Sequence, residues 1–184
     1  MDPQKYSYKP YENIYPTLFK SEESRLKLEL GVNNKIDHFG SSSVPNLGGK
    51  GIIDIFITTE RDKVESTSKI LQEKLGYDLR PAGGDERRLF FRRYQKDDNN
   101  IQRTYHAHLT DTENPNYEQS IALRDYLRSH PVEAKRYDNI KRQASELAMK
   151  SNDYEEQKKT YQKSKSSLLE ELNQKSLSWF KSFK

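Results

Sequence analysis

The densest candidate chemistry in the sequence lies in a glycine- and serine-rich segment that runs from Gly40 to Gly51. Glycines let a backbone approach a ligand closely, and consecutive backbone N–H groups can form a nest that binds anions. The segment is not a Walker loop, because Lys50 is followed by glycine and not by serine or threonine. The plainer alternative is a flexible loop without a ligand. We predict a phosphate-binding loop whose ligand-binding residues are Gly40, Ser41, Ser42, Ser43 and Lys50.

A single carboxylate, Asp54, interrupts the apolar run from Ile52 to Thr58 that follows this loop. The β-branched composition of the run predicts a buried central strand. Burying a carboxylate is costly unless a partner compensates its charge. A divalent metal is one such partner, and magnesium commonly bridges a carboxylate and substrate phosphates. We therefore interpret Asp54 as the candidate catalytic residue and metal ligand. The alternative is an acid satisfied by an arginine or a backbone donor.

Two histidines, His106 and His108, are separated by one residue in a predicted strand over 104–109. Their side chains share one face about 7 Å apart, so both imidazoles can converge on one metal ion. If this strand lies beside the one that carries Asp54, the three residues resemble a two-histidine, one-carboxylate ligand set. That set suits zinc, manganese or iron better than magnesium. The alternative is that both imidazoles bind phosphate or only line the sheet.

Arginines and aromatic residues are interleaved in a third predicted strand, over 87–94. The period of two places Arg88, Phe90 and Arg92 on one face. Guanidinium groups bind phosphate bidentately, and arginines interleaved with aromatic rings suit stacking on nucleobases. We predict Arg88 and Arg92 as phosphate ligands. The alternative is that they are solvated or paired with acids, and the sequence does not fix which face of this strand lines a pocket.

The surrounding pattern predicts an α+β fold with a small mixed sheet, a leading helix and a helical C-terminal third. Helical spacing of apolar residues marks 16–30 and 62–75, a short strand is expected at 35–39, and everything after Glu118 is expected to be helical. Pro131 suits the first turn of one helix. Asp153 and Glu156 resemble a capping box at the start of another.

Composition excludes several classes of protein. The chain has 184 residues, in the usual range of one domain, and no cysteine, which excludes disulfides, thiolate zinc sites and a cysteine nucleophile. Charged residues make up 33% and hydrophobic ones 32%. Uninterrupted apolar stretches are far shorter than the ~20 residues that a membrane span needs. Residues 1–5 carry no apolar signal core, so we expect a cytoplasmic protein that does not bind membranes.

The whole net charge of +4 comes from residues 130–184, which hold 12 basic and 8 acidic groups. Such a region can meet RNA or phosphate, although a solvated helical face is the more ordinary explanation. An apolar stripe near the C-terminus is expected to serve as core or as a homodimer contact. Its residues are Leu168, Leu169, Leu172, Trp179, Phe180 and Phe183.

The segment 38–54 resembles the signature of the GrpB family, a branch of the nucleotidyltransferase-fold superfamily. The residues in register are His38, Gly40, Ser41, Ser43, Val44, Pro45, Leu47, Lys50, Ile52, Ile53 and Asp54. The likeness continues over nearly the whole chain, through Tyr77, Arg87, Arg88, His106, His108, residues 124–128, His130, Pro131, Tyr137, Lys141, Tyr161 and Lys165. The resemblance implies a nucleotidyltransferase-like sheet flanked by helices. It also implies one domain over 1–184, in which a core over about 1–115 carries a packed helical region over about 116–184.

The sequence departs from these patterns at three positions. Gly49 and Gly51 stand where the family commonly has alanine and proline, which is expected to loosen the loop. Phe56 stands where active nucleotidyltransferases generally carry the second acid of an Asp-x-Asp pair, which holds two metal ions from one face of the strand. Asp54 is alone, as resemblance to the GrpB branch implies. Two-metal nucleotidyl transfer is therefore not the expected chemistry.

Two classes of function fit these observations. The first is a nucleotide-binding protein that transfers a nucleotidyl group from an NTP to a hydroxyl acceptor with a divalent metal (Mg, Mn or Zn). The second is a non-catalytic module that binds nucleotide, RNA or protein, and Phe56 favours it. A bare RNA binder that uses the basic C-terminal third predicts affinity that falls steeply with salt.

Overall fold

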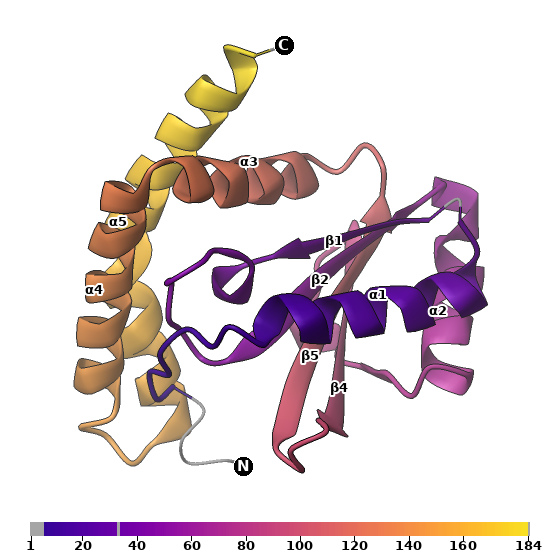
Figure 1. The fold of residues 1–184 in the computed structure, drawn as a ribbon, viewed down its shortest axis with the longest axis horizontal. Helices are drawn as coiled ribbons and strands as arrows, with labels where there is room; N and C mark the ends of the chain where they lie inside the picture. The colour runs from indigo at the N-terminus through magenta and orange to yellow at the C-terminus, as the bar shows by residue number, and fades with distance from the viewer. Residues whose placement is uncertain (1–5, 33, 184) are drawn as a thin grey trace. The chain divides into compact units, whose positions relative to one another are not determined.

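The computed structural model describes residues 6–32 and 34–183 (Figure 1). Residues 1–5, on which the absence of a signal core rests, lie outside this part. The contacts divide the chain into two compact units, each assembled from separate segments. The helical unit comprises Met1–Asn13, Val44–Gly51 and Gln119–Lys184, and the sheet unit comprises Ile14–Ser43 and Ile52–Glu118. The single-domain interpretation stays a prediction.

The sheet unit contains a five-stranded mixed sheet in the order β1-β2-β5-β4-β3. β2 and β5 are parallel, and the other neighbours are antiparallel. The α+β prediction is confirmed, and each predicted strand lies within a residue or two of its expected place. Only the two-residue β3 was not expected from the sequence. The strands are β1 (Lys35–Phe39), β2 (Ile52–Thr59), β3 (Asp78–Leu79), β4 (Arg88–Lys96) and β5 (Gln102–Asp111).

One face of this sheet is apolar and is covered by helix α1 (Tyr15–Leu30). The alternate β2 residues Ile53, Ile55 and Ile57 point to this face and are fully buried. Phe19 of α1 stacks on the His38 ring, whose strand position pairs with Ile55. Helix α2 (Val64–Glu73) contacts both α1 and β5. The opposite face is therefore the one that carries Asp54, His106 and the other even-numbered residues of β2, β4 and β5.

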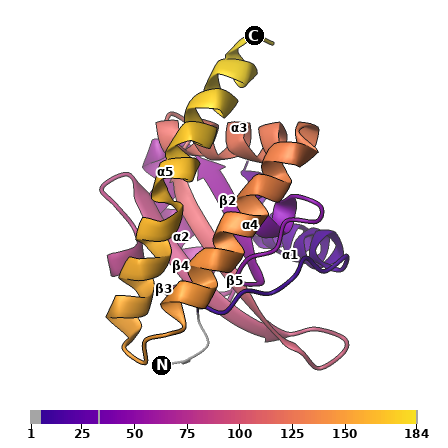
Figure 2. The ribbon, with the colours of Figure 1, turned by 90° about the vertical axis from the view of Figure 1, so that its left-hand side faces the viewer.

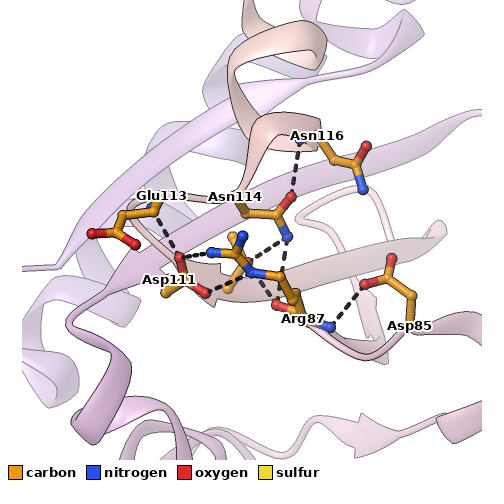
Figure 3. Close-up of polar contacts among 7 residues, drawn as sticks. Asp85, Arg87, Asp111, Glu113, Asn114 and Asn116 are labelled. Carbon is orange, nitrogen blue, oxygen red and sulfur yellow. Dashed lines mark hydrogen bonds and ion pairs between the residues drawn. The ribbon is translucent and has the colours of Figure 1, made fainter.

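A polar network ties the start of β4 to the end of β5 (Figure 3). The Arg87 guanidinium donates from Nη2 and Nε to the two carboxylate oxygens of Asp111, at 2.6 and 3.3 Å. The Asn114 amide donates to the Thr110 hydroxyl, which itself donates to the Arg87 carbonyl. Asn114 also accepts from the backbone N–H of Asn116, just inside helix α3 (Pro115–Ser129). These bonds fix how the chain leaves the sheet.

Replacing Arg87 with methionine is expected to lower the free energy of unfolding by about 1–3 kcal/mol at pH 7, because Asp111 is buried and would lose a charged partner. Burial alone would raise the pKa of Asp111, but the hydrogen bonds from Arg87 and the Glu113 backbone outweigh it and hold that pKa below its ordinary value. A lowered carboxyl pKa stabilises the fold above that ordinary value and loses its effect as the pH falls through the folded-state pKa.

Urea unfolding of both proteins between pH 7 and pH 3 measures this effect. The difference between wild type and variant should shrink in the acid range. Arg80→Met is the matched control, since the Arg80–Asp78 pair is exposed and should contribute no more than about 1 kcal/mol. If Arg87→Met lowers the free energy of unfolding no more than the control does, the Arg87–Asp111 pair does not stabilise the fold as predicted.

The helical unit is built on an antiparallel pair, α4 (Pro131–Ala148) and α5 (Tyr154–Lys181), preceded by the later part of α3 (Figure 2). Pro131 occupies the first turn of α4, as predicted. Asp153 caps α5 by accepting from the Glu156 backbone N–H at 2.8 Å, which confirms half of the predicted capping box. The return bond differs, because the Asp153 N–H donates to the Ser151 hydroxyl, which itself donates to the Glu156 carboxylate. The C-terminal stripe divides: Leu168 and Leu172 are core, while Phe183 is 74% exposed. A homodimer contact through the stripe stays a prediction.

The segment 44–51 packs within the helical unit. Val44 and Leu47 join its core. The backbone of Gly48 is held at both ends, because its N–H donates to Asp138 at 2.8 Å and its carbonyl accepts from the Lys141 ammonium. Within residues 6–32 and 34–183, no helix is long and apolar enough to cross a membrane.

Candidate functional site

A row of paired residues crosses the sheet face opposite α1. We call it the polar row, and its residues, from β1 to β3, are Phe39, Asp54, His106, Arg92 and Asp78. The register of β4 settles a question that the sequence left open. The predicted phosphate ligands Arg88 and Arg92 point to the same face as both histidines. The sheet unit therefore gathers Asp54, His106 and Arg92 from three neighbouring strands.

Asp54 and His106 lie side by side at the centre of the polar row. Nδ1 of His106 is 3.4 Å from Oδ1 of Asp54, and their side chains are 14% and 24% exposed. β2 and β5 are parallel neighbours with these two residues directly opposite each other. The condition attached to the sequence prediction, that the two strands be adjacent, is met. A carboxylate and an imidazole at this separation can share one cation.

Gly40 brings the predicted loop against Asp54. Its φ is +70°, a backbone conformation that residues other than glycine rarely adopt. A Cβ atom added at Gly40 would lie 2.5 Å from Oδ2 of Asp54, far inside van der Waals contact. Glycine is therefore needed here for two independent reasons. The loop backbone therefore passes directly beside the Asp54 carboxylate.

The two buried serines of the loop bond to nearby residues of the same chain segment, Ser42 to the preceding strand β1 and Ser43 within the loop. The Ser42 hydroxyl lies 3.0 Å from Nε2 of His38, and the Ser43 hydroxyl donates to the Gly40 carbonyl at 2.6 Å. Both residues belong to a short 3₁₀ turn, η1 (Ser41–Ser43). These bonds shape the turn that follows Gly40. Phosphate binding by the loop stays a prediction, and these two hydroxyls would serve it by holding the turn.

His108 has a different environment from His106. Its Nδ1 lies 2.8 Å from Nη1 of Arg88, and because a guanidinium only donates, Nδ1 accepts and Nε2 carries the proton. Burial lowers the pKa of His108 to about 3, so the ring is neutral. Among the residues that the structure describes, no three His, Cys, Asp or Glu side chains are placed to hold a metal together. Metal ligation by Asp54, His106 and His108 as a set stays a prediction.

Phe56, which replaces the second acid, is packed as a core residue. It is 1% exposed, and its ring contacts those of Phe39, His108 and Tyr117 at centroid distances of 4.2, 5.3 and 5.4 Å. An aspartate at this place would bury a charge among aromatic rings. The local packing, and not only one residue, thus differs from a two-carboxylate site.

Arg92 carries an unusual feature for a structural arginine. Its Nε is buried and has no hydrogen-bond partner in the described part of the chain. Its guanidinium lies over the ring of Tyr94, 5.0 Å from the centroid. Leaving a buried donor unsatisfied costs about 1–3 kcal/mol, so an anionic acceptor at this place would be stabilised. The sequence prediction did not single out Tyr94, although its position two residues after Arg92 on the strand was the signal.

Lys50 belongs to the helical unit. Its ammonium lies 5.4 Å from the ring centroid of Tyr6 and 5.9 Å from that of Tyr161. Lys165 lies over the same Tyr161 ring at 5.2 Å. The contact of Lys50 with phosphate stays a prediction.

The family model described as GrpB protein matches residues 6–175. The chain belongs to the GrpB family. The solved structure of the conserved protein GrpB from Enterococcus faecalis superposes with a TM-score of 0.76 and 26% identity, covering 94% of this chain and 98% of that one.

Two curated relatives are similar to this chain over more than two thirds of its length. The UPF0157 protein YqkA of Bacillus subtilis (strain 168) is 37% identical over 134 residues, which are 72% of this chain and 38% of YqkA. This chain thus spans well under half the length of that relative. The glutamate-rich protein GrpB of Alkalihalophilus pseudofirmus is 29% identical over 132 residues, 70% of this chain and 75% of the relative. The GrpB signature segment itself is divided in this structure, because 44–51 belongs to the helical unit and its flanks belong to the sheet unit.

Proposed function

We propose that this GrpB-family chain is a nucleotide-binding protein, and that the polar row holds the nucleotide phosphates together with one divalent metal ion. The observation that carries the proposal is the buried, unpartnered Nε of Arg92, beside the Asp54–His106 pair. In this proposal a cation site and an anion site would lie next to each other on three adjacent strands. That combination suits a metal–phosphate ligand better than either ion alone.

Each residue of the polar row has a role in this proposal. Asp54 and His106 supply an oxygen and a nitrogen ligand, a pair that suits manganese or zinc and tolerates magnesium. Bound there, the ion would neutralise phosphate charge. Arg92 would donate to a phosphate oxygen, which would satisfy its buried Nε. Arg88 is held by Asp85 and His108 and would act by orienting His108.

The transfer of a nucleotidyl group to a hydroxyl acceptor is the stronger form of this proposal. Asp54 would then be the only carboxylate at the position where two-metal enzymes use a pair. The burial of Phe56 among aromatic rings favours the weaker form, a nucleotide-binding module without chemistry. The two forms share the same binding site and differ only in turnover.

Calorimetric titration of ATP, GTP, CTP and UTP, each with Mg²⁺, Mn²⁺ or Zn²⁺, tests the shared site. Wild type should bind nucleotide only when metal is present. Asp54→Asn should lose the metal-dependent binding of nucleotide. Arg92→Gln should weaken nucleotide binding by about tenfold or more, because a hydrogen bond to a charged group contributes about 1.5–3 kcal/mol. Asp62→Asn, at an exposed acid of the 3₁₀ turn η2 (Arg61–Lys63), is the matched control and should bind as wild type does.

The absence of binding for every nucleotide and metal would overturn the proposal. Binding that is retained in Asp54→Asn would move the site elsewhere. Chromatography for released pyrophosphate, after a panel of hydroxyl acceptors is added to the same mixtures, then separates the two forms, since only the transferase joins the nucleotidyl group to an acceptor hydroxyl and releases pyrophosphate. Steeply salt-dependent binding of RNA without nucleotide binding would favour the basic C-terminal region instead.

A further inference from the structure

Tyr94 extends the polar face of the sheet by one step beyond Arg92. On β4 the two residues are separated by one position, so both side chains lie on the same face, about 7 Å apart along the strand. Their partners on β5 are Thr104 and His106, respectively. Tyr94 therefore lies on the same strand face as the proposed phosphate ligand, one strand repeat away.

The Tyr94 ring contacts Arg92 and still exposes surface to which a ligand could bind. The Arg92 guanidinium lies over it, 5.0 Å from the ring centroid, in a geometry that fixes the ring through a cation–π contact. Even so, Tyr94 is 48% exposed, one of the more exposed large apolar side chains in the described residues. Neighbouring core aromatics such as Phe91 are fully buried. A strand that buries one aromatic ring and presents the next has a rigid aromatic surface to offer a ligand.

We infer that Tyr94 is a stacking platform for the base of the bound nucleotide, an inference that rests on the proposed phosphate site. Phosphate at Arg92 and a base on Tyr94 would place the two ends of a nucleotide on consecutive same-face positions of β4. Base–aromatic stacking contributes about 1–3 kcal/mol per base and tolerates any base, since every base has a π face. The expected ligand class is a nucleoside phosphate with weak base preference, purines stacking over more area than pyrimidines.

The Arg92–Tyr94 contact also allows a second interpretation, in which Tyr94 only positions Arg92. If Tyr94 only supports Arg92, its removal should weaken every phosphate ligand equally, with or without a base. A stacking platform affects only ligands that carry a base. Inorganic tripolyphosphate and ATP, each with Mn²⁺, are therefore the two probes that separate these roles.

The experiment compares wild type, Tyr94→Leu and Tyr94→Phe by calorimetric titration with both probes. Wild type should bind ATP more tightly than tripolyphosphate. Tyr94→Leu should lose about tenfold or more in ATP affinity and keep its tripolyphosphate affinity, and Tyr94→Phe should behave as wild type does. Gln95→Leu, at the exposed next position on the opposite face, is the matched control and should change neither affinity.

Three outcomes would overturn the inference. Equal losses for both probes in Tyr94→Leu would make Tyr94 a support for Arg92. Equal affinity of wild type for the two probes would show that the base is not bound, while the phosphate site would stand. Binding of neither probe to folded wild type would remove the proposed function and this inference with it. Circular dichroism of Tyr94→Leu, a change at an exposed position, confirms that each comparison is made on folded protein.

Discussion

Replacing Gly40 with alanine is expected to abolish metal-dependent nucleotide binding and to lower the free energy of unfolding by about 2–4 kcal/mol. The backbone contribution comes from a φ of +70°, which costs a residue with a Cβ atom about 1–2 kcal/mol. The remainder comes from the new methyl group, which would lie 2.5 Å from Oδ2 of Asp54. Either the carboxylate or the loop must move, and both belong to the proposed site.

Gly31→Ala separates these two effects. Gly31 also has a positive φ, +81°, but a Cβ atom there would meet nothing within 4 Å. The control should therefore lose stability through its backbone alone and bind nucleotide as wild type does. Urea unfolding and the calorimetric titration together measure both quantities. Wild-type affinity in Gly40→Ala would show that the approach of the loop to Asp54 is not part of the binding site.

The sequence predicted the strands of the candidate site and the face on which its side chains lie better than it predicted which strands are neighbours. A period of two placed His106 and His108 on one face, and β-branched composition identified β2, because both are local properties of a strand. The adjacency of β2 and β5 was only a condition in that prediction. Strand order depends on how a parallel connection crosses the sheet, and no residue within either strand encodes it.

The sequence did not predict the partners of individual polar side chains or the shortest strand. His106 and His108 look equivalent in sequence, yet the Arg88 guanidinium, 20 positions before His108, occupies Nδ1 of His108 alone. Ser42 is a residue type that commonly binds phosphate, but its hydroxyl lies 3.0 Å from Nε2 of His38, four residues earlier on the other side of Gly40. β3 has two residues, too few to show any periodicity. Each of these features depends on the path of the folded chain, which the periodicity and composition of one segment do not report.

Replacing Asp138 with alanine is expected to lower the free energy of unfolding by about 2–4 kcal/mol, because it leaves buried donors without their charged acceptor. Asp138 is 8% exposed and accepts from the Gly48 N–H at 2.8 Å and from the Tyr8 hydroxyl at 2.8 and 3.0 Å. Burial raises the pKa of Tyr8 to about 12, and the hydrogen bond to Asp138 adds to this, so the phenol remains a donor. Alanine would leave these donors without their acceptor. It would also remove the carboxylate close to the buried ammonium of Lys141, since both bond the peptide groups of Gly48.

Glu146→Ala is the matched control, because it removes an exposed acid from the same helix and should change stability by no more than about 0.5 kcal/mol. Asp138→Asn keeps one carbonyl oxygen and should fall between the two. Urea unfolding of the three variants measures the order. A loss in Asp138→Ala as small as that in Glu146→Ala would mean that water replaces the carboxylate. The segment 44–51 would then be held by the packing of Val44 and Leu47 in the apolar core rather than by the hydrogen bonds between α4 and Gly48. If the predicted order holds, Gly48 is explained by packing inside the helical unit and not by a ligand, because a Cβ atom there would collide with the Tyr8 phenol and the Lys9 carbonyl while α4 bonds its peptide groups.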